Sequence, residues 1–111
     1  MTDLVVNPAV FADLSENVGE DFAIELVSTF LDEAPRMFSD LENAARQADA
    51  EAFRRAAHSL KSNAEIFGAD RLTAMAREME VSGLPDDMSP IANLQTMLLE
   101  TSDALRKLIN E

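Results

Sequence analysis

The chain has 111 residues, with 21 acidic side chains against 9 basic ones and a formal charge of −12. Its length predicts one domain over residues 1–111, with a core large enough to need no disulfide or metal. The sequence has no cysteine, no apolar run of membrane-spanning length and no signal-peptide pattern at its start, which together exclude thiolate chemistry and favour a cytoplasmic protein without membrane contact. The acidity argues against nucleic acid as a partner.

The first predicted helix begins at Asn7-Pro8, because asparagine caps helix N-termini and proline is favoured in the first turn. Its apolar face runs through Phe11 and Leu14 to Val18, and Gly19 interrupts it. This spacing predicts a short amphipathic helix.

From Glu20 to Ala48, apolar residues recur every three or four positions, the pattern of a helix with one buried face. Pro35 lies inside this run and removes one backbone hydrogen bond, yet the apolar stripe keeps its phase across it. We therefore expect one long bent helix, with two shorter helices as the alternative. The stripe consists of Ile24, Val27, Phe30, Leu31, Ala34, Phe38, Leu41, Ala45 and Ala48.

Three more amphipathic helices follow. Asp49 is the expected cap of a helix that stops at Gly68, and Asp70 is the expected cap of one that ends near Gly83. Ser89-Pro90 opens the last, which extends to Leu108. Because the connections are short and no segment alternates with period two, we predict an all-α fold, an antiparallel up-and-down four-helix bundle with an additional short N-terminal helix. The expected inward residues are Phe53, Ala56, Ala57, Leu60, Ala64 and Phe67, then Leu72, Met75, Ala76 and Met79, and finally Ile91, Leu94, Leu98, Leu105 and Leu108.

The single histidine, His58, lies on the polar side of the third predicted helix. At 100° per residue, the other apolar positions of this helix fall within roughly 40° of Phe53, whereas His58 falls about 140° away. His58 is therefore expected to be an exposed imidazole, whose unprotonated nitrogen is a nucleophile.

Charged side chains surround His58 at helical spacing. In chain order, this strip contains Glu51, Arg54, Arg55, His58, Lys61, Ser62 and Glu65. A nitrogen nucleophile between cations suits a group that arrives with negative charge, and a phosphoryl group is the obvious candidate. By composition alone, a solvated helix face with an ordinary Lys61–Glu65 pair explains the same residues.

The sequence around His58 resembles the histidine-containing phosphotransfer (HPt) domain family. That family's signature is His-x-Leu-Lys-Gly/Ser, five variable residues, a glycine, and a second helix that ends in an apolar residue beside an acid or amide. The matching segments are His58-Ser59-Leu60-Lys61-Ser62, Gly68-Ala69, Leu72 and Met79-Glu80. Phe30-Leu31-x-x-Ala34-Pro35 and Asp49-x-x-x-Phe53-x-x-x-Ala57-His58 extend the likeness over nearly the whole chain.

The resemblance implies a helical bundle whose exposed histidine exchanges a phosphoryl group with the aspartate of a receiver domain. Carried over by position, His58 is the phosphoryl acceptor and Lys61 stabilises the phosphoryl charge. Glu80, where many members have glutamine, orients the imidazole by accepting a hydrogen bond from Nδ1. Ser62 stands where glycine is common and keeps the histidine face open, and Gly68 permits the tight turn and packing between the two central helices.

The same resemblance implies the partners. These are the receiver domains of response regulators and a sensor or hybrid histidine kinase, with Mg²⁺ bound by the receiver and no cofactor or metal bound by this chain. Because the sequence has no Gly-rich phosphate loop, we expect a stand-alone, monomeric phosphoryl carrier and not an enzyme with its own kinase apparatus. Arg54, Arg55 and Glu65 are candidates for partner docking.

The acidity is not evenly spread. Residues 46–77 hold six basic and four acidic side chains, a local charge of 6 − 4 = +2, and the remainder holds three basic and 17 acidic, 3 − 17 = −14. The one basic stretch therefore surrounds the one histidine, as a phosphoryl group and an acidic receiver pocket require. Two alternatives remain: an adaptor that docks on a receiver or kinase without chemistry, and a helical interaction module outside phosphosignalling. A di-metal enzyme is disfavoured, since no Glu-x-x-His pair is present.

Overall fold

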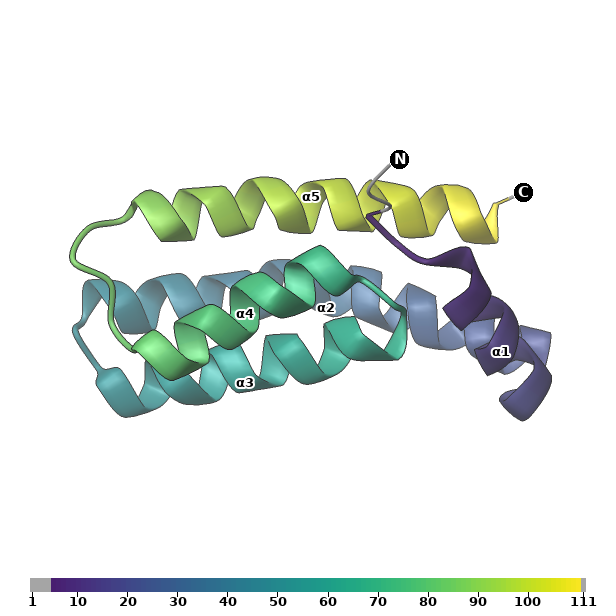
Figure 1. Cartoon of the computed structure of the whole chain (residues 1–111), viewed down its shortest axis with the longest axis horizontal. Coiled ribbons are helices and arrows are strands. Elements are labelled where there is room, and N and C mark those ends of the chain that lie inside the picture. The colour runs from purple at the N-terminus through teal and green to yellow at the C-terminus, as the bar shows by residue number, and fades with distance from the viewer. Residues whose placement is uncertain (1–4, 111) are drawn as a thin grey trace.

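The computed structural model describes residues 5–110, and within that range the chain forms five helices and no strand (Figure 1). The all-α prediction is confirmed. The expectation of one domain over residues 1–111 also takes in residues 1–4 and 111, which lie outside the described part. The helices are α1 (Pro8–Val18), α2 (Glu20–Arg46), α3 (Ala50–Ile66), α4 (Asp70–Ser82) and α5 (Ser89–Ile109).

The four longer helices form a bundle, and α1 packs on the first part of α2 at one end of it (Figure 1). Helices α2 and α4 each contact both α3 and α5, so the four surround a common core. The colours of Figure 1 show the chain reversing direction at each connection from α2 to α5. The side chains of α3 and α4 that face away from the core therefore share one outer face of the bundle.

Local capping explains where two helices begin. The side-chain oxygens of Asn7 and Asp49 accept backbone hydrogen bonds from residues two and three positions later, at 3.0 and 3.1 Å, as predicted. The capping prediction for Asp70 is wrong, because Asp70 is the first residue inside α4. Helix α5 begins at Ser89-Pro90, as predicted. Ala69 precedes α4 without a side-chain cap, and before α5 it is Asp87 whose carboxylate accepts the backbone N–H of Ser89, at 2.8 Å.

Helix α2 continues through Pro35 without a break, so the expectation of one long helix is confirmed over the alternative of two. The predicted stripe is wrong at its end, where Ala44 is buried and Ala48 is exposed. The physical reason is that α2 stops at Arg46 and the backbone turns, with Ala48 at φ 54°, so the helical phase no longer applies. Val18, at the end of α1, is likewise exposed.

The core is built from the inward faces of the bundle helices. Phe53, Leu60, Leu72 and Leu94 are completely buried, and each large apolar side chain of this kind contributes about 1.5–3 kcal/mol to folding. The rings of Phe30 on α2 and Phe67 after α3 pack with their centroids 5.6 Å apart. These contacts fix the rotation of α3 about its own axis, which in turn decides which of its residues face solvent.

No helix in the described range 5–110 combines the length and the apolar character needed to cross a membrane.

Candidate functional site

Helix α3 presents His58 to solvent. On its opposite side Phe53, Ala57, Leu60 and Ala64 are completely buried, and this apolar face leaves the imidazole 56% exposed. The sequence prediction of an exposed histidine is confirmed, because the inward residues of α3 recur at the helical period and His58 falls outside their arc.

The imidazole of His58 contacts a carboxylate on the neighbouring helix. Its Nδ1 lies 2.8 Å from Oε2 of Glu80, in the last turn of α4. Met79 and Ala76 of α4 are buried in the core, so the outer edge of α4 next to α3 carries Glu80, whose side chain is only 18% exposed. The contact joins residues that are 22 positions apart in the sequence.

The same carboxylate binds Lys61. The ammonium Nζ lies 2.7 Å from Oε1 of Glu80, and the lysine side chain is 20% exposed. Lys61 thus reaches across to α4 instead of pairing with Glu65, so the i,i+4 pair considered above is not formed. Glu80 bridges His58 and Lys61, with one oxygen for each.

Electrostatics keep Glu80 ionised. A hydrogen bond from Lys61 lowers the pKa of the Glu80 carboxyl below its ordinary 4.5, burial opposes this shift, and the hydrogen bond from His58 lowers the pKa further. The stabilisation from this carboxylate is therefore present above its ordinary pKa and is lost as the pH falls through the lowered one. An ionised carboxylate can only accept hydrogen bonds, so Nδ1 of His58 is the donor. In the neutral ring this leaves the lone pair on the exposed Nε2.

The two arginines before His58 lie differently. Arg54 donates to Glu51 through Nη2 at 2.7 Å and Nε at 3.3 Å. Arg55 lines a shallow groove between α2 and α3, together with Asp40 and Ser59. Only Arg54 is therefore turned to the side of α3 that carries the Glu80 contact.

Two further residues predicted for the site, Ser62 and Glu65, are exposed on α3. The structure places them on the same helix as His58 but does not join either to the contacts among His58, Lys61 and Glu80.

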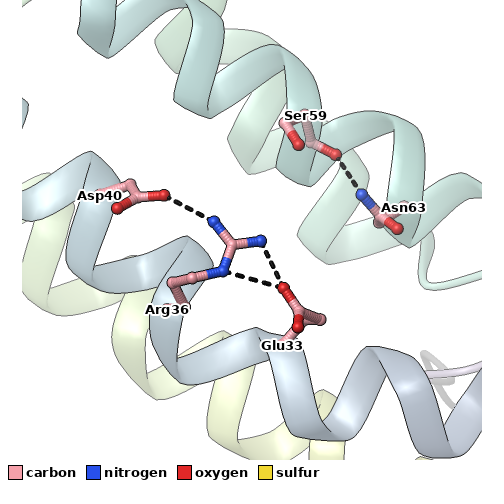
Figure 2. A network of polar contacts seen from close by, with 5 residues as sticks. All are labelled: Glu33, Arg36, Asp40, Ser59 and Asn63. Carbon is pink, nitrogen blue, oxygen red and sulfur yellow. Dashed lines mark hydrogen bonds and ion pairs between the residues drawn. The ribbon is translucent and has the colours of Figure 1, made fainter.

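A separate polar cluster lies on the other side of α3, facing α2 (Figure 2). Arg36 donates to Glu33 and Asp40 on its own helix, the latter at 3.0 Å, and the Asn63 amide donates to the Ser59 carbonyl at 2.8 Å. The charge of Arg36 is offset within α2, so this cluster supplies no cation to His58. Sequence reasoning did not single it out.

Gly68 forms the turn between α3 and α4 with φ 67°, a conformation that glycine adopts without steric cost. Its carbonyl accepts the backbone N–H of Asn7 at 3.1 Å. A Cβ on Gly68 would lie 2.7 Å from a methyl carbon of Val10. The sequence pattern predicted tight packing at Gly68 between the two central helices. In the structure α1 also approaches Gly68 closely, which the sequence pattern did not indicate.

A metal site is not evident in the part of the chain that is described, since no three histidine, cysteine or acidic side chains of residues 5–110 gather as metal ligands.

Known proteins share the fold of this chain. The Hpt domain family model matches residues 25–104. Histidine-containing phosphotransfer protein B from Pseudomonas aeruginosa PAO1 is similar in structure, with a TM-score of 0.86 and 23% identity over 98% of this chain and 97% of that one. The HPT domain of an Hpt sensor hybrid histidine kinase from Shewanella has a TM-score of 0.79 and 17% identity over 96% of this chain and 94% of that one. A search of curated proteins found no match.

The chain therefore belongs to the Hpt domain family. Members of this family are phosphocarriers of two-component signalling and not kinases, and they interact with histidine kinases and receiver domains.

Proposed function

We propose that His58 is the phosphoryl acceptor of a His–Asp phosphorelay. It takes the group from an aspartyl phosphate on a receiver domain and passes it to another receiver aspartate or back. The observation that carries this proposal is the hydrogen bond of Nδ1 to the ionised Glu80, which leaves Nε2 exposed with its lone pair outward. Nucleophilic attack needs a nitrogen in this state.

In the proposed transfer, the Nε2 lone pair attacks phosphorus in line with the bond to the aspartyl oxygen. The Nε2–P bond forms as the P–O bond breaks, and the aspartate leaves as a carboxylate. The proton on Nδ1 stays in its hydrogen bond to Glu80, so the positive charge that develops on the ring lies against a carboxylate. Transfer to the next receiver reverses these steps.

The proposal also assigns roles to Lys61 and to the partners of this chain. Lys61 holds Glu80 with one of its three donors and has others to offer to phosphoryl oxygens. The receiver would supply the aspartate and a bound Mg²⁺, whose charge would help to neutralise the phosphoryl oxygens. A sensor or hybrid histidine kinase feeds the relay, and the exchange takes place in the cytoplasm with this chain as a monomeric carrier.

The direct test is phosphoryl transfer from phosphorylated receiver domains to the full chain. We expect phosphate that is labile in acid and stable in base, mapped to His58 by mass spectrometry. Binding of receivers without any uptake of phosphate would contradict the proposal and support a non-phosphorylated adaptor. Neither binding nor uptake from any receiver would support an interaction module outside phosphosignalling.

Replacing Glu80 by alanine is expected to slow phosphoryl uptake by about 10- to 100-fold, because the group that orients the nucleophile is lost. Glu80→Gln is the matched control: its amide oxygen still accepts from Nδ1, so its uptake should stay closer to wild type. Nitrogen NMR of the imidazole should show a protonated Nδ1 in the wild type and a mixture of tautomers in Glu80→Ala. Unchanged tautomers and rates in Glu80→Ala would assign Glu80 a structural role only.

A further inference from the structure

Phosphorylation of His58, on which this inference rests, creates a surplus of negative charge. The phosphoryl group adds about 1.5 to 2 negative charges near neutral pH, and it arrives next to Glu80, which is ionised. The nearest cation, Lys61, is already bound to Glu80 at 2.7 Å. Its charge is thus offset by the carboxylate before any phosphoryl group arrives, and a second cation is needed.

Arg54 lies where such a cation is required. It precedes His58 by four residues on α3, about 40° from it around the helix axis and on the side of Lys61 and Glu80. Arg55 is rotated about 60° from His58 in the opposite sense and lines the groove toward α2. Arg54 and Arg55 are adjacent in sequence but lie on different sides of α3.

The state of Arg54 supports this placement. Its hydrogen bond to Glu51 is the main cause that raises the pKa of the guanidinium, and attraction to Glu80 is among the smaller causes. Arg54 is thus within electrostatic reach of the carboxylate that holds His58. The Arg54 and Glu51 side chains are 50% and 60% exposed, and water screens an ion pair at such a surface, so the guanidinium can leave it for a more highly charged group.

We propose that Arg54 is a second phosphoryl-binding residue of this site. Its guanidinium is held one turn from His58 by Glu51 and binds the phosphoryl oxygens when His58 is phosphorylated. The exchange is non-covalent: the hydrogen bonds to Glu51 are replaced by hydrogen bonds to phosphoryl oxygens. Arg54 thereby stabilises the phosphohistidine, and Glu51 competes with the phosphoryl group for the Arg54 guanidinium.

Other charged residues also lie near His58, and the test must distinguish their effects from that of Arg54. On α3 they are Glu51, Lys61 and Glu65, and on α4 they are Glu80 and Arg77, which lies one turn before Glu80 and is exposed. Arg77 is the rival candidate for the second cation, and Arg55 controls for the loss of a positive charge close to His58 in sequence.

The test uses the full chain, phosphorylated with potassium phosphoramidate so that no receiver partner is needed. In this reaction the P–N bond of the donor breaks, ammonia leaves and the Nε2–P bond forms. The ³¹P resonance of the phosphohistidine is then followed against pH in the wild type and in Arg54→Gln, Arg55→Gln, Arg77→Gln and Glu51→Gln. All four substitutions are at exposed positions, and circular dichroism confirms that each variant is folded.

We expect Arg54→Gln to raise the second pKa of the phosphoryl group by roughly half a unit, because one adjacent positive charge is lost. Glu51→Gln should lower it, since Arg54 no longer has a competing acceptor, and Arg55→Gln and Arg77→Gln should each shift it by less than half as much as Arg54→Gln. An unchanged pKa in Arg54→Gln, or an equal rise in Arg55→Gln or Arg77→Gln, overturns this inference while phosphorylation of the wild type at His58 still stands. A wild-type chain that takes no phosphate on His58 overturns the proposed function as well.

Discussion

His58→Gln is expected to abolish phosphoryl uptake while leaving the bundle intact. The amide nitrogen of glutamine has no free lone pair for attack on phosphorus, so the chemical step loses its nucleophile. We expect the fold to be unchanged, because the imidazole is 56% exposed and hydrogen-bonds to Glu80 of α4, a carboxylate to which glutamine can still donate. Substitutions at such surface positions change stability by about 0.5 kcal/mol or less.

This prediction is checked by incubating wild type and variant with the same phosphorylated receiver and measuring acid-labile phosphate on each. Circular dichroism and urea unfolding of both chains separate lost chemistry from lost structure. Retention of phosphate by a folded His58→Gln variant would show that another residue is the acceptor. A variant that unfolds would instead show that the Glu80 contact is structural.

Gly68→Ala is expected to destabilise the protein by about 2–5 kcal/mol. A non-glycine residue at φ 67° costs about 1–2 kcal/mol, and forcing a methyl group into a packed contact costs about 1–3 kcal/mol more. The new Cβ would lie 2.7 and 2.8 Å from carbons of the Val10 side chain and 3.2 Å from Cβ of Asn7. Urea unfolding, followed by circular dichroism, measures the loss.

A double-mutant cycle with Val10→Gly tests whether the contact with α1 is the cause. Val10→Gly removes both Val10 carbons that lie nearest to the new Cβ, so the double variant should be more stable than the sum of the two single effects predicts. Strict additivity would show that the cost lies in the backbone at Gly68 and not in its packing against α1.

Sequence reasoning succeeded where the signal is local. The caps at Asn7 and Asp49 were predictable because the side chain and the backbone N–H that it binds are two or three residues apart. It failed at Asp70, where the residue type suits a cap but the helix begins one position earlier than the pattern indicated. The boundary there depends on how the preceding turn packs.

In the candidate site, too, the features that depend on one helix were predictable and the contact between two helices was not. The exposure of His58 and its i+3 relation to Lys61 follow from the period of α3 alone. The partner of Lys61 does not: the sequence offers Glu65 one turn away, whereas the structure pairs Lys61 with Glu80 on α4. A buried face can be read from one helix, but a contact between two helices requires their relative rotation and axial register.

By itself, the sequence determined that the chain is all-α, where its helices approximately lie, and that its one histidine faces solvent amid basic residues. These properties depend on periodicity and capping, which act over a few residues. Only the tertiary structure decided that Glu80 bridges His58 and Lys61. It also decided that Gly68 packs against α1 and that Arg54 and Arg55 lie on different sides of α3. Each of these depends on how separate helices dock, which is set by side-chain packing across the whole core.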